Sequence, residues 1–253
     1  MEQQVFGMPK AMKPEQTLYC PGCGHGVAHR LVAELVDEFG LRDRAIGIAP
    51  VGCSVFADKY WNFDVISAAH GRAPAVATGM KRGRPDSFVI CYQGDGDLAA
   101  IGTAETIHAA NRGEHFVTIF VNNAIYGMTG GQMAPTTLIG QPSQTCQLGR
   151  DPEMMGHPIR VCELIKDLPG VAFVARGSVD TPKNVLTVKK HIKKGFQNAI
   201  DGKGWSLIEI VSPCPTNWGM TPLKALTWLR ENMLEHYELG VFRDCDAGNG
   251  GGA

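Results

Sequence analysis

The sequence predicts an α/β fold in which helices cover a mostly parallel β-sheet. Short apolar runs alternate with amphipathic stretches along most of the chain, as they do in repeated βα units. The chain has 253 residues, 44% of them hydrophobic, which is enough to bury one sizeable core. Glycine-rich and polar motifs directly follow several apolar runs, at the place where a parallel sheet forms its ligand crevice.

Five short apolar runs are predicted to be strands, because they are rich in Val, Ile and Phe and are bounded by polar or glycine residues. Amphipathic helices are predicted between them, because their apolar residues recur at helical spacing. The expected strands are residues 45–50, 88–93, 115–122, 171–176 and 207–211, and the expected helices are residues 27–39, 73–81, 98–110, 182–200 and 223–237.

Residues 1–240 are predicted to form a single domain, and residues 241–253 a flexible C-terminal tail that ends in Gly, Asn and Ala. Residues 124–158 form a long aperiodic stretch with many Gly, Pro, Thr and Gln residues. A loop of this length inside a compact domain is usually functional.

The formal net charge of −1 argues against nucleic acid as a partner, since phosphate binding needs an excess of clustered Lys and Arg. No window approaches the roughly 18 apolar residues of a membrane span, and residues 1–13 lack the apolar core of a secretory signal. We therefore expect a cytoplasmic protein with no membrane partner. Its eight cysteines should be reduced, and serve as ligands, catalysts or buried hydrophobic groups.

The motif Gly94-Asp95-Gly96-Asp97 follows a predicted strand and opens a helix. Glycine lets the backbone approach a ligand closely, and the helix N-terminus offers free N–H groups to a phosphate. An Asp carboxylate would repel that phosphate, and a divalent cation between them resolves the conflict. Mg²⁺ prefers oxygen ligands and bridges carboxylates to phosphates.

Asn122-Asn123 ends the next predicted strand. Either motif alone is more simply explained as a turn or a strand-end loop. Together, one helix apart, they resemble the signature of the thiamine diphosphate enzymes. The resemblance implies that Asp95, the Asn123 side chain and the Ile125 carbonyl bind Mg²⁺, with the diphosphate of the cofactor completing the coordination.

A third motif, Tyr126-Gly127-Met128-Thr129-Gly130-Gly131-Gln132, follows at once. Its glycines and Thr129 suit a second backbone contact to phosphate, and Tyr126 is placed at the same cofactor. The alternative is a plain glycine turn. By the family resemblance, Met128 lies near the reactive thiazolium ring and is a candidate catalytic residue.

Cys20 and Cys23 form a Cys-x-x-Cys pair at the start of the first helix. Such a pair can be redox-active, or can bind zinc or an iron–sulfur cluster. Either metal site needs two more ligands. Cys53 and Cys214 are the candidates, because each follows a predicted strand at the same edge of the sheet and has Gly or Pro beside it.

Over about residues 10–220, the chain resembles the thiamine-binding subunit of the 2-oxo acid:ferredoxin oxidoreductases. The likeness rests on the motifs above, on Cys20-Pro-Gly-Cys-Gly-His25 and on His70-Gly-Arg-Ala-Pro74. It implies a three-layer thiamine diphosphate-binding fold. It also implies a [4Fe–4S] cluster, next to the cofactor, on Cys20, Cys23, Cys53 and Cys214.

The family resemblance implies oxidative decarboxylation of a 2-oxo acid to acyl-CoA and CO₂. Coenzyme A is then a co-substrate, and electrons pass through the cluster to ferredoxin. The chain is expected to contain only the diphosphate-binding domain. An alpha subunit is therefore expected to supply the pyrimidine-binding domain and its catalytic Glu, and small subunits to carry further iron–sulfur clusters. The isolated chain is expected to be inactive.

Roles for three further residues stay open. Beside the cofactor, His25 and His70 could orient substrate or transfer a proton, or each could be a structural hydrogen-bonding group. Arg72 could bind a substrate carboxylate or pair with a local acid. Gly130 and Gly131 stand where family members acting on 2-oxoglutarate often carry a basic residue, so a branched-chain 2-oxo acid is preferred over 2-oxoglutarate.

Two other functions compete with this interpretation. A thiamine-dependent decarboxylase or synthase subunit without a redox role would have no use for four cysteines at the cofactor edge. A zinc-stapled structural subunit with a vestigial diphosphate site would have no reason to keep both Asp95 and Asn123.

Overall fold

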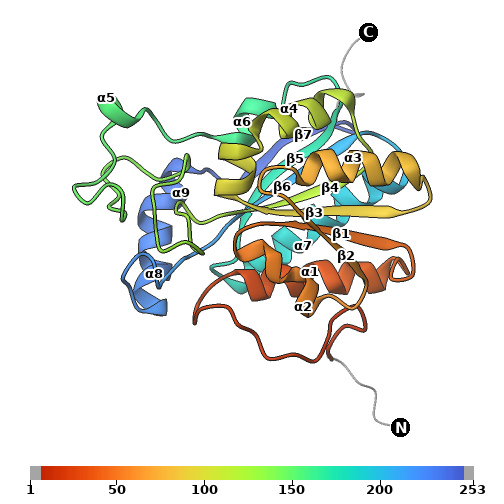
Figure 1. Ribbon diagram of the computed structural model, residues 1–253, viewed down its shortest axis with the longest axis horizontal. Helices are drawn as coiled ribbons and strands as arrows, with labels where there is room; N and C mark the ends of the chain where they lie inside the picture. The colour runs from red at the N-terminus through yellow and green to blue at the C-terminus, as the bar shows by residue number, and fades with distance from the viewer. Residues whose placement is uncertain (1–6, 248–253) are drawn as a thin grey trace.

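The computed structural model describes residues 7–247 and contains a seven-stranded sheet with helices on both faces (Figure 1). The strand order is β2-β1-β3-β4-β6-β5-β7, and neighbours pair in parallel except for β5 with β7. The predicted three-layer α/β fold with a mostly parallel sheet is confirmed. The strands are β1 (Ala45–Pro50), β2 (Asp64–Ala68), β3 (Phe88–Gly94), β4 (Val117–Asn122), β5 (Val171–Ser178), β6 (Trp205–Val211) and β7 (Gly240–Asp244).

All five predicted strands are present, and the two edge strands β2 and β7 are additional. Both edge strands are partly exposed, so neither has the continuous apolar run that marks a buried parallel strand. The predicted flexible tail is wrong for residues 241–244, which pair with β5, and Asp246 forms ion pairs with Lys194 and Lys203. The rest of that tail, residues 248–253, lies outside the described part of the chain.

Helices α1 (His25–Glu38) and α7 (Pro182–Ile200) cover one face of the sheet (Figure 1). The opposite face is covered by α3 (Ala73–Gly83), α4 (Thr103–Arg112) and α6 (Val161–Ile165). Alternate residues of β3 enter the two cores, because successive side chains of a strand point to opposite faces. Within residues 7–247, no helix combines the length and apolarity needed to cross a bilayer. The short helical segments are η1 (Cys53–Phe56), α2 (Ala57–Tyr60), η2 (Gly96–Ile101), α5 (Pro152–Met155), α8 (Pro222–Trp228), η3 (Leu229–Met233) and α9 (Leu234–His236).

The helix predicted over residues 98–110 is α4 preceded by a π-helical turn, η2. The Gly102 N–H donates to the Asp97 carbonyl at 2.8 Å, which closes this wider turn. A Cβ at Gly102 would lie 2.6 Å from that oxygen and 2.7 Å from the Gly71 carbonyl, so only glycine lets the two loops meet. The π turn therefore brings the loop at Gly71 against the Gly-Asp-Gly-Asp motif.

Residues 123–160 form the predicted long aperiodic segment, interrupted only by the single-turn helix α5. With α8, η3 and α9 it extends beyond the carboxyl ends of the strands, at the left of Figure 1. This part has a small core of its own, formed by Ala124, Leu138, Leu229, Met233 and Tyr237 with the end of β6. The segment is thus anchored to the C-terminal helices.

Gly47, on the central part of β1, provides a test of the core beneath it. A Cβ at this position would lie 2.9 Å from the ring of the fully buried Trp61. We expect Gly47→Ala to lower the free energy of unfolding by about 1–3 kcal/mol through overpacking. Urea unfolding followed by circular dichroism measures the change.

Gly79→Ala is the matched control, because Gly79 is an exposed residue of helix α3 with no atom within 4 Å of its Cβ position. The higher helix propensity of alanine should raise the free energy of unfolding by about 0.5–1 kcal/mol. Equal stability of Gly47→Ala and the unsubstituted chain would contradict the packing of Trp61 on β1.

Candidate active site

The predicted site features lie at the carboxyl ends of four neighbouring parallel strands, β1, β3, β4 and β6. The strand ends are level with one another, since Gly94 pairs with Val121 and Asn122 with Val211. The predicted gathering of these features along one edge is confirmed. In strand order they are Cys53, Gly94–Asp97, Asn122-Asn123 and Cys214.

Asp95 is a buried carboxylate at the start of η2, 4% exposed. It accepts hydrogen bonds from Gly96 N at 2.9 Å, Ile125 N at 3.1 Å and Thr136 Oγ1 at 2.9 Å. These three donors are neutral, and burial raises the pKa of Asp95 to about 6. A cation next to Asp95 would lower that pKa again by stabilising the charged form.

Three oxygen atoms converge at this carboxylate. Asn123 Oδ1 lies 2.7 Å from the Ile125 carbonyl oxygen and 3.3 Å from Asp95 Oδ2, and all three atoms are acceptors. Turning the Asn123 amide would place a donor there, whereas a bound cation would satisfy the amide as it stands. A carboxylate, an amide oxygen and a carbonyl oxygen are hard ligands of the kind that Mg²⁺ prefers, so these residues fit that ion.

Asp97, the second carboxylate of the motif, is occupied by other contacts. Its Oδ1 accepts from Gly71 N at 2.5 Å and lies 2.6 Å from His70 Nδ1, and its Oδ2 accepts from Gln93 Nε2 at 2.6 Å. Burial raises the pKa of Asp97. Its role in the structure is to fix the His70 ring rather than to present a free oxygen to a cation.

A cavity of about 150 Å³ lies at this edge. It is lined by all the residues predicted to bind the cofactor and by His70 and Met128. Arg72 does not line it. A larger groove of about 960 Å³ between the N-terminal segment, α1 and α7 contains none of them. The predicted residues that line the smaller cavity are His25, Cys53, His70, Gly94, Asp95, Gly96, Asp97, Asn123, Ile125, Tyr126, Met128 and Thr129.

Arg72 forms an ion pair with Glu105 of α4 and does not line the cavity. The structure therefore favours the local-acid alternative, and a contact between Arg72 and substrate stays a prediction. Met128 is 45% exposed at the cavity. The Thr129 hydroxyl donates to Gln132 Oε1 at 2.5 Å within the same turn.

Cys53 and Cys214 meet the cofactor motif at Gly127. A Cβ on Gly127 would lie 3.4 Å from Cys53 Sγ and 3.5 Å from Cys214 Sγ. Asn217 Nδ2 donates to the Gly127 carbonyl at 2.8 Å and to Cys214 Sγ at 3.3 Å, and so joins the two motifs. The predicted cysteine site and the predicted cofactor site are therefore adjacent.

Cys20 and Cys23 occupy the turn before α1. Burial, with the neighbouring Cys214, Cys53 and Cys20, raises the pKa of Cys23 to about 12, and burial likewise raises the pKa of Cys53 to about 12. The Cys23 and Cys53 thiolates would therefore form only beside a strong positive charge.

The four sulfur atoms are not gathered around one point. No three of them lie within 4.8 Å of one another. A tetrahedral zinc ion with Zn–S bonds of about 2.3 Å would place its sulfur ligands about 3.8 Å apart. The arrangement therefore does not match a closed zinc site.

His25 begins α1 and is 2% exposed. Its Nδ1 lies 2.6 Å from the Tyr92 hydroxyl, and its ring stacks on Tyr19 with centroids 4.8 Å apart. Burial lowers the pKa of His25 to about 4. His25 is therefore a neutral, tightly packed group in the cavity wall at pH 7.

The model of the thiamine pyrophosphate enzyme C-terminal TPP-binding domain matches residues 50–210. The ketoisovalerate oxidoreductase subunit VorA of Methanothermobacter thermautotrophicus is 48% identical over 243 residues, which cover 96% of this chain and 51% of VorA. The 2-oxoglutarate synthase subunit KorB of Methanocaldococcus jannaschii is 35% identical over 223 residues, 86% of this chain and 78% of KorB. The chain belongs to the thiamine pyrophosphate-binding subunits of the 2-oxo acid:ferredoxin oxidoreductases.

The fold agrees with this membership. A structure of 2-oxoglutarate:ferredoxin oxidoreductase from Magnetococcus marinus, with 2-oxoglutarate, coenzyme A and succinyl-CoA bound, superposes with a TM-score of 0.78. The match has 24% sequence identity and covers 96% of this chain and 86% of the other. The resemblance proposed from the motifs is confirmed. The oxidoreductase subunit spans about half the length of the VorA relatives that it matches.

Sequence reasoning missed several residues that shape the site of this oxidoreductase subunit. Thr136 and Tyr237 support Asp95 from the long segment and from the C-terminal helices. Asn217 and Trp218 reach Gly127 and the Asn123 carbonyl from beyond β6. None lies in a recognisable motif, and each acts across at least 41 residues of sequence. The aperiodic segment is a sequence signal for Thr136 alone.

The lowered pKa of His25 predicts a pH-dependent loss of stability. The unfolded chain binds a proton at His25 with a pKa of 6.5 and the folded chain with one of about 4, so acid favours unfolding in this window. Between pH 7 and pH 5 the free energy of unfolding should fall by about 2 kcal/mol on this account. Urea unfolding at both values, for the unsubstituted chain and for His25→Gln, measures this contribution.

The comparison between the two proteins isolates His25. The raised pKa of Asp95 acts with the opposite sign, adding stability as the pH falls below about 6, but it does so in both proteins and cancels in the difference. A His25→Gln variant that lost as much stability in acid as the unsubstituted chain would contradict the buried, neutral His25.

Proposed function

We propose that the chain binds thiamine diphosphate through Mg²⁺, with Asp95, the Asn123 side chain and the Ile125 carbonyl as the protein ligands. The observation that carries this proposal is the convergence of their three acceptor oxygens at one point. At Gly94 no atom lies within 4 Å of the Cβ position, so the backbone is open there. At Gly96 a Cβ would lie 2.5 Å from the Tyr126 ring, so only glycine fits beside that ring. The diphosphate would supply further oxygens to the ion.

We also propose that Cys20, Cys23, Cys53 and Cys214 hold one [4Fe–4S] cluster. The support is that Cys53 and Cys214 lie beside the cofactor motif at Gly127, that Cys23 lies close enough to the other three thiols for their charges to raise its pKa, and that no three of the four sulfur atoms lie within 4.8 Å of one another. Asn217 would donate a hydrogen bond to the Cys214 thiolate in the cluster-bound state. Such hydrogen bonds tune the reduction potential of iron–sulfur clusters.

The proposed reaction is the oxidative decarboxylation of a 2-oxo acid, with coenzyme A as acyl acceptor and ferredoxin as electron acceptor. When bound, thiamine diphosphate would supply a nucleophilic carbon for the 2-oxo carbon of the substrate and a ring that holds the electron pair left behind when CO₂ departs. His70, oriented by Asp97, presents its other ring nitrogen as a donor or acceptor for substrate. Met128 and neutral His25 line the same cavity and limit access of water to it.

A partner subunit is needed to complete this site. The cavity of about 150 Å³ is below the roughly 300–1,000 Å³ of sites that enclose a small molecule. We propose that an alpha subunit supplies the pyrimidine-binding domain and its catalytic Glu, and that small subunits carry further iron–sulfur clusters to ferredoxin. The cytoplasmic location stays a prediction.

The proposed substrate is a branched-chain 2-oxo acid, with 2-oxoglutarate as the second candidate. The 48% identity to the ketoisovalerate enzyme exceeds the 35% identity to the 2-oxoglutarate enzyme. Gly130 and Gly131 both have positive φ, at 107° and 95°, so a basic side chain that could bind a second carboxylate would be strained there. The cavity near Met128 thus offers no charge to a dicarboxylate from these positions.

The two competing functions are less well supported. The wide sulfur spacing disfavours a zinc staple. A thiamine enzyme without a redox role would not need the Cys53 and Cys214 thiols next to the cofactor motif at Gly127. Metal analysis decides between these alternatives directly.

The cluster is tested by the metal content of protein purified without oxygen, together with its partner subunits. We expect Cys20→Ser to lose about four iron atoms per chain, because the cluster loses a ligand. Cys245→Ser is the control, since Cys245 lies beyond β7, outside the site, and should keep its full iron content. Zinc lost in place of iron would overturn the cluster and favour the structural staple.

Turnover tests the partner and the substrate together. With its partner subunits, the protein should reduce a viologen dye in a coenzyme A-dependent reaction. We expect kcat/KM for ketoisovalerate to exceed that for 2-oxoglutarate by at least about tenfold, which corresponds to about 1.4 kcal/mol in transition-state binding. The isolated chain should give no turnover. Full activity of the isolated chain, or a preference for 2-oxoglutarate, would contradict the respective part of the proposal.

A further inference from the structure

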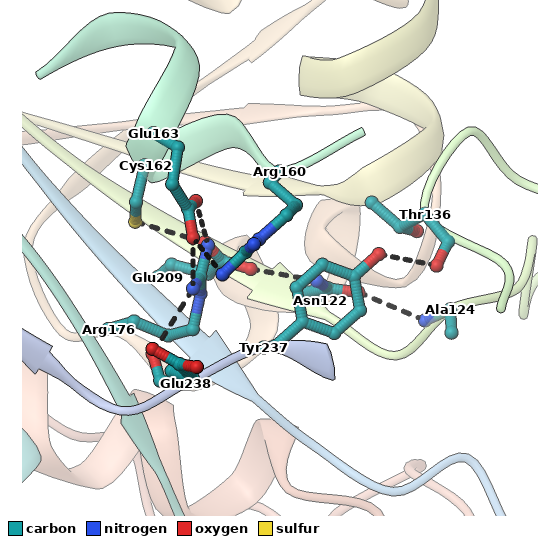
Figure 2. A network of polar contacts seen from close by, with 10 residues as sticks. All are labelled: Asn122, Ala124, Thr136, Arg160, Cys162, Glu163, Arg176, Glu209, Tyr237 and Glu238. Carbon is teal, nitrogen blue, oxygen red and sulfur yellow. Dashed lines mark hydrogen bonds and ion pairs between the residues drawn. The ribbon is translucent and has the colours of Figure 1, made fainter. Parts of the chain in front are cut away.

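A buried polar network lies behind the proposed metal site and crosses β4, β6 and β5 (Figure 2). Its centre is the ion pair between Arg176 and Glu209, which face each other on neighbouring strands and are both 0% exposed. Arg176 Nε lies 2.8 Å from Glu209 Oε2. Removing two charges from water is costly, and apolar residues of similar size often stabilise a fold at least as much as a buried ion pair does. Stability alone therefore does not account for this ion pair.

The Arg176 guanidinium is fixed on all sides. Its Nη1 and Nη2 donate to the two carboxylate oxygens of Glu163 at 3.1 and 2.6 Å, and Nη1 also donates to the Glu238 carbonyl at 3.1 Å. Figure 2 shows these groups converging from α6 and from the segment before β7. Arg176 thus fixes the position of the Glu209 carboxylate, and the next contact of that carboxylate leads to the site.

Glu209 Oε1 accepts a hydrogen bond from Asn122 Nδ2 at 2.7 Å, and Asn122 Oδ1 accepts from Ala124 N at 3.1 Å. A carboxylate can only accept hydrogen bonds, so Glu209 orients the Asn122 amide with its NH₂ group toward Glu209 and its oxygen toward Ala124. Among residues 7–247, Ala124 is the non-glycine residue with positive φ, 57°. This left-handed conformation is unfavourable for a residue with a Cβ, and the Asn122 hydrogen bond stabilises it. Ala124 separates Asn123 from Ile125, so its conformation sets the direction of both proposed metal ligands.

A second branch reaches the third ligand. The Tyr237 hydroxyl donates to the Thr136 carbonyl at 2.6 Å, and the Thr136 hydroxyl donates to Asp95 Oδ2 at 2.9 Å. The Arg176 guanidinium lies over the Tyr237 ring, 5.3 Å from its centroid. Both branches thus start at the Arg176 guanidinium, and together they end at the three oxygens of the proposed Mg²⁺ site.

We infer that Glu209 and Arg176 are positioning residues for the Mg²⁺ site, acting through the Asn122 amide and the left-handed turn at Ala124. The inference rests on the proposed function, because it needs the metal site to exist. Hydrogen-bond partners behind metal ligands typically change metal affinity 10–100-fold when they are replaced. The network supplies such partners to ligands from both β3 and β4.

Binding of Mn²⁺ to the chain assembled with its partner subunits, in the presence of thiamine diphosphate, tests this inference without any need for turnover when it is measured by electron paramagnetic resonance. Mn²⁺ accepts the same oxygen ligands as Mg²⁺. We expect Glu209→Gln to weaken Mn²⁺ binding at least tenfold, because the neutral amide places a donor against Arg176 or against Asn122. Asn122→Ala should weaken binding to a similar extent, and it also provides the measurement if Glu209→Gln fails to fold.

Glu114→Gln is the matched control. Glu114 is also buried, accepts from Arg82 and Arg112 at 2.7 Å each, and precedes β4 at the opposite end of the sheet. Its loss should lower stability while leaving the Mn²⁺ dissociation constant within twofold of the unsubstituted chain. Because Glu209 and Asn122 act along one path, the double variant should lose no more affinity than the weaker-binding single variant.

The outcomes separate the inference from the proposed function. Asp95→Asn, which removes a proposed ligand, should abolish Mn²⁺ binding. If the unsubstituted chain bound no Mn²⁺ with thiamine diphosphate, the metal site would be refuted and the positioning role with it. If Mn²⁺ bound and Asp95→Asn abolished binding, but Glu209→Gln and Asn122→Ala matched Glu114→Gln, the metal site would stand and the positioning role would be refuted.

Discussion

The parallel pairing of β3 with β4 is the constraint on which the rest of the candidate site depends. It places Gly94 beside Val121, and so brings Asp95 within hydrogen-bond distance of Ile125, 30 residues further along the chain. The α4 crossover between the two strands makes this pairing parallel and puts both strand ends at one edge. The pairings of β1 with β3 and β4 with β6 then bring the cysteine turns to the same edge.

The site concentrates groups whose charged forms are unfavourable in the protein alone. Burial raises the pKa values of Asp95 and Cys53, which line the cavity, and that of Cys23, whose pKa is also raised by the charge of Cys53. Arg72, a cationic side chain in the loop next to Gly71, forms an ion pair with Glu105 instead. Such an arrangement costs stability in an empty protein and is relieved when positively charged centres bind, which is the usual balance between stability and function.

The sequence was sufficient to predict the fold class, the five buried strands and most of the residues that line the cavity of the candidate site. Buried parallel strands are visible as apolar runs, and the residues proposed to bind phosphate or metal stand in short motifs next to them. The edge strands β2 and β7 could not be predicted, because half-exposed residues show no such run. Thr136, Asn217 and Tyr237 could not be predicted either, because their contacts depend on how the long segment and the C-terminal helices pack. Arg72 shows the reverse case, in which a residue inside a motif pairs locally.

The position of β6 has a consequence for how the protein is made. In sequence β6 follows β5, but in the sheet it lies between β4 and β5. A nascent chain that ends at β5 therefore exposes an unpaired edge of β4, and lacks Cys214 and Tyr237. Domains fold from the N-terminal side as they emerge from the ribosome, and open strand edges invite association with other chains. The candidate site is accordingly complete only after translation has passed the C-terminal helices, and until then this edge of the sheet is open to association with other chains.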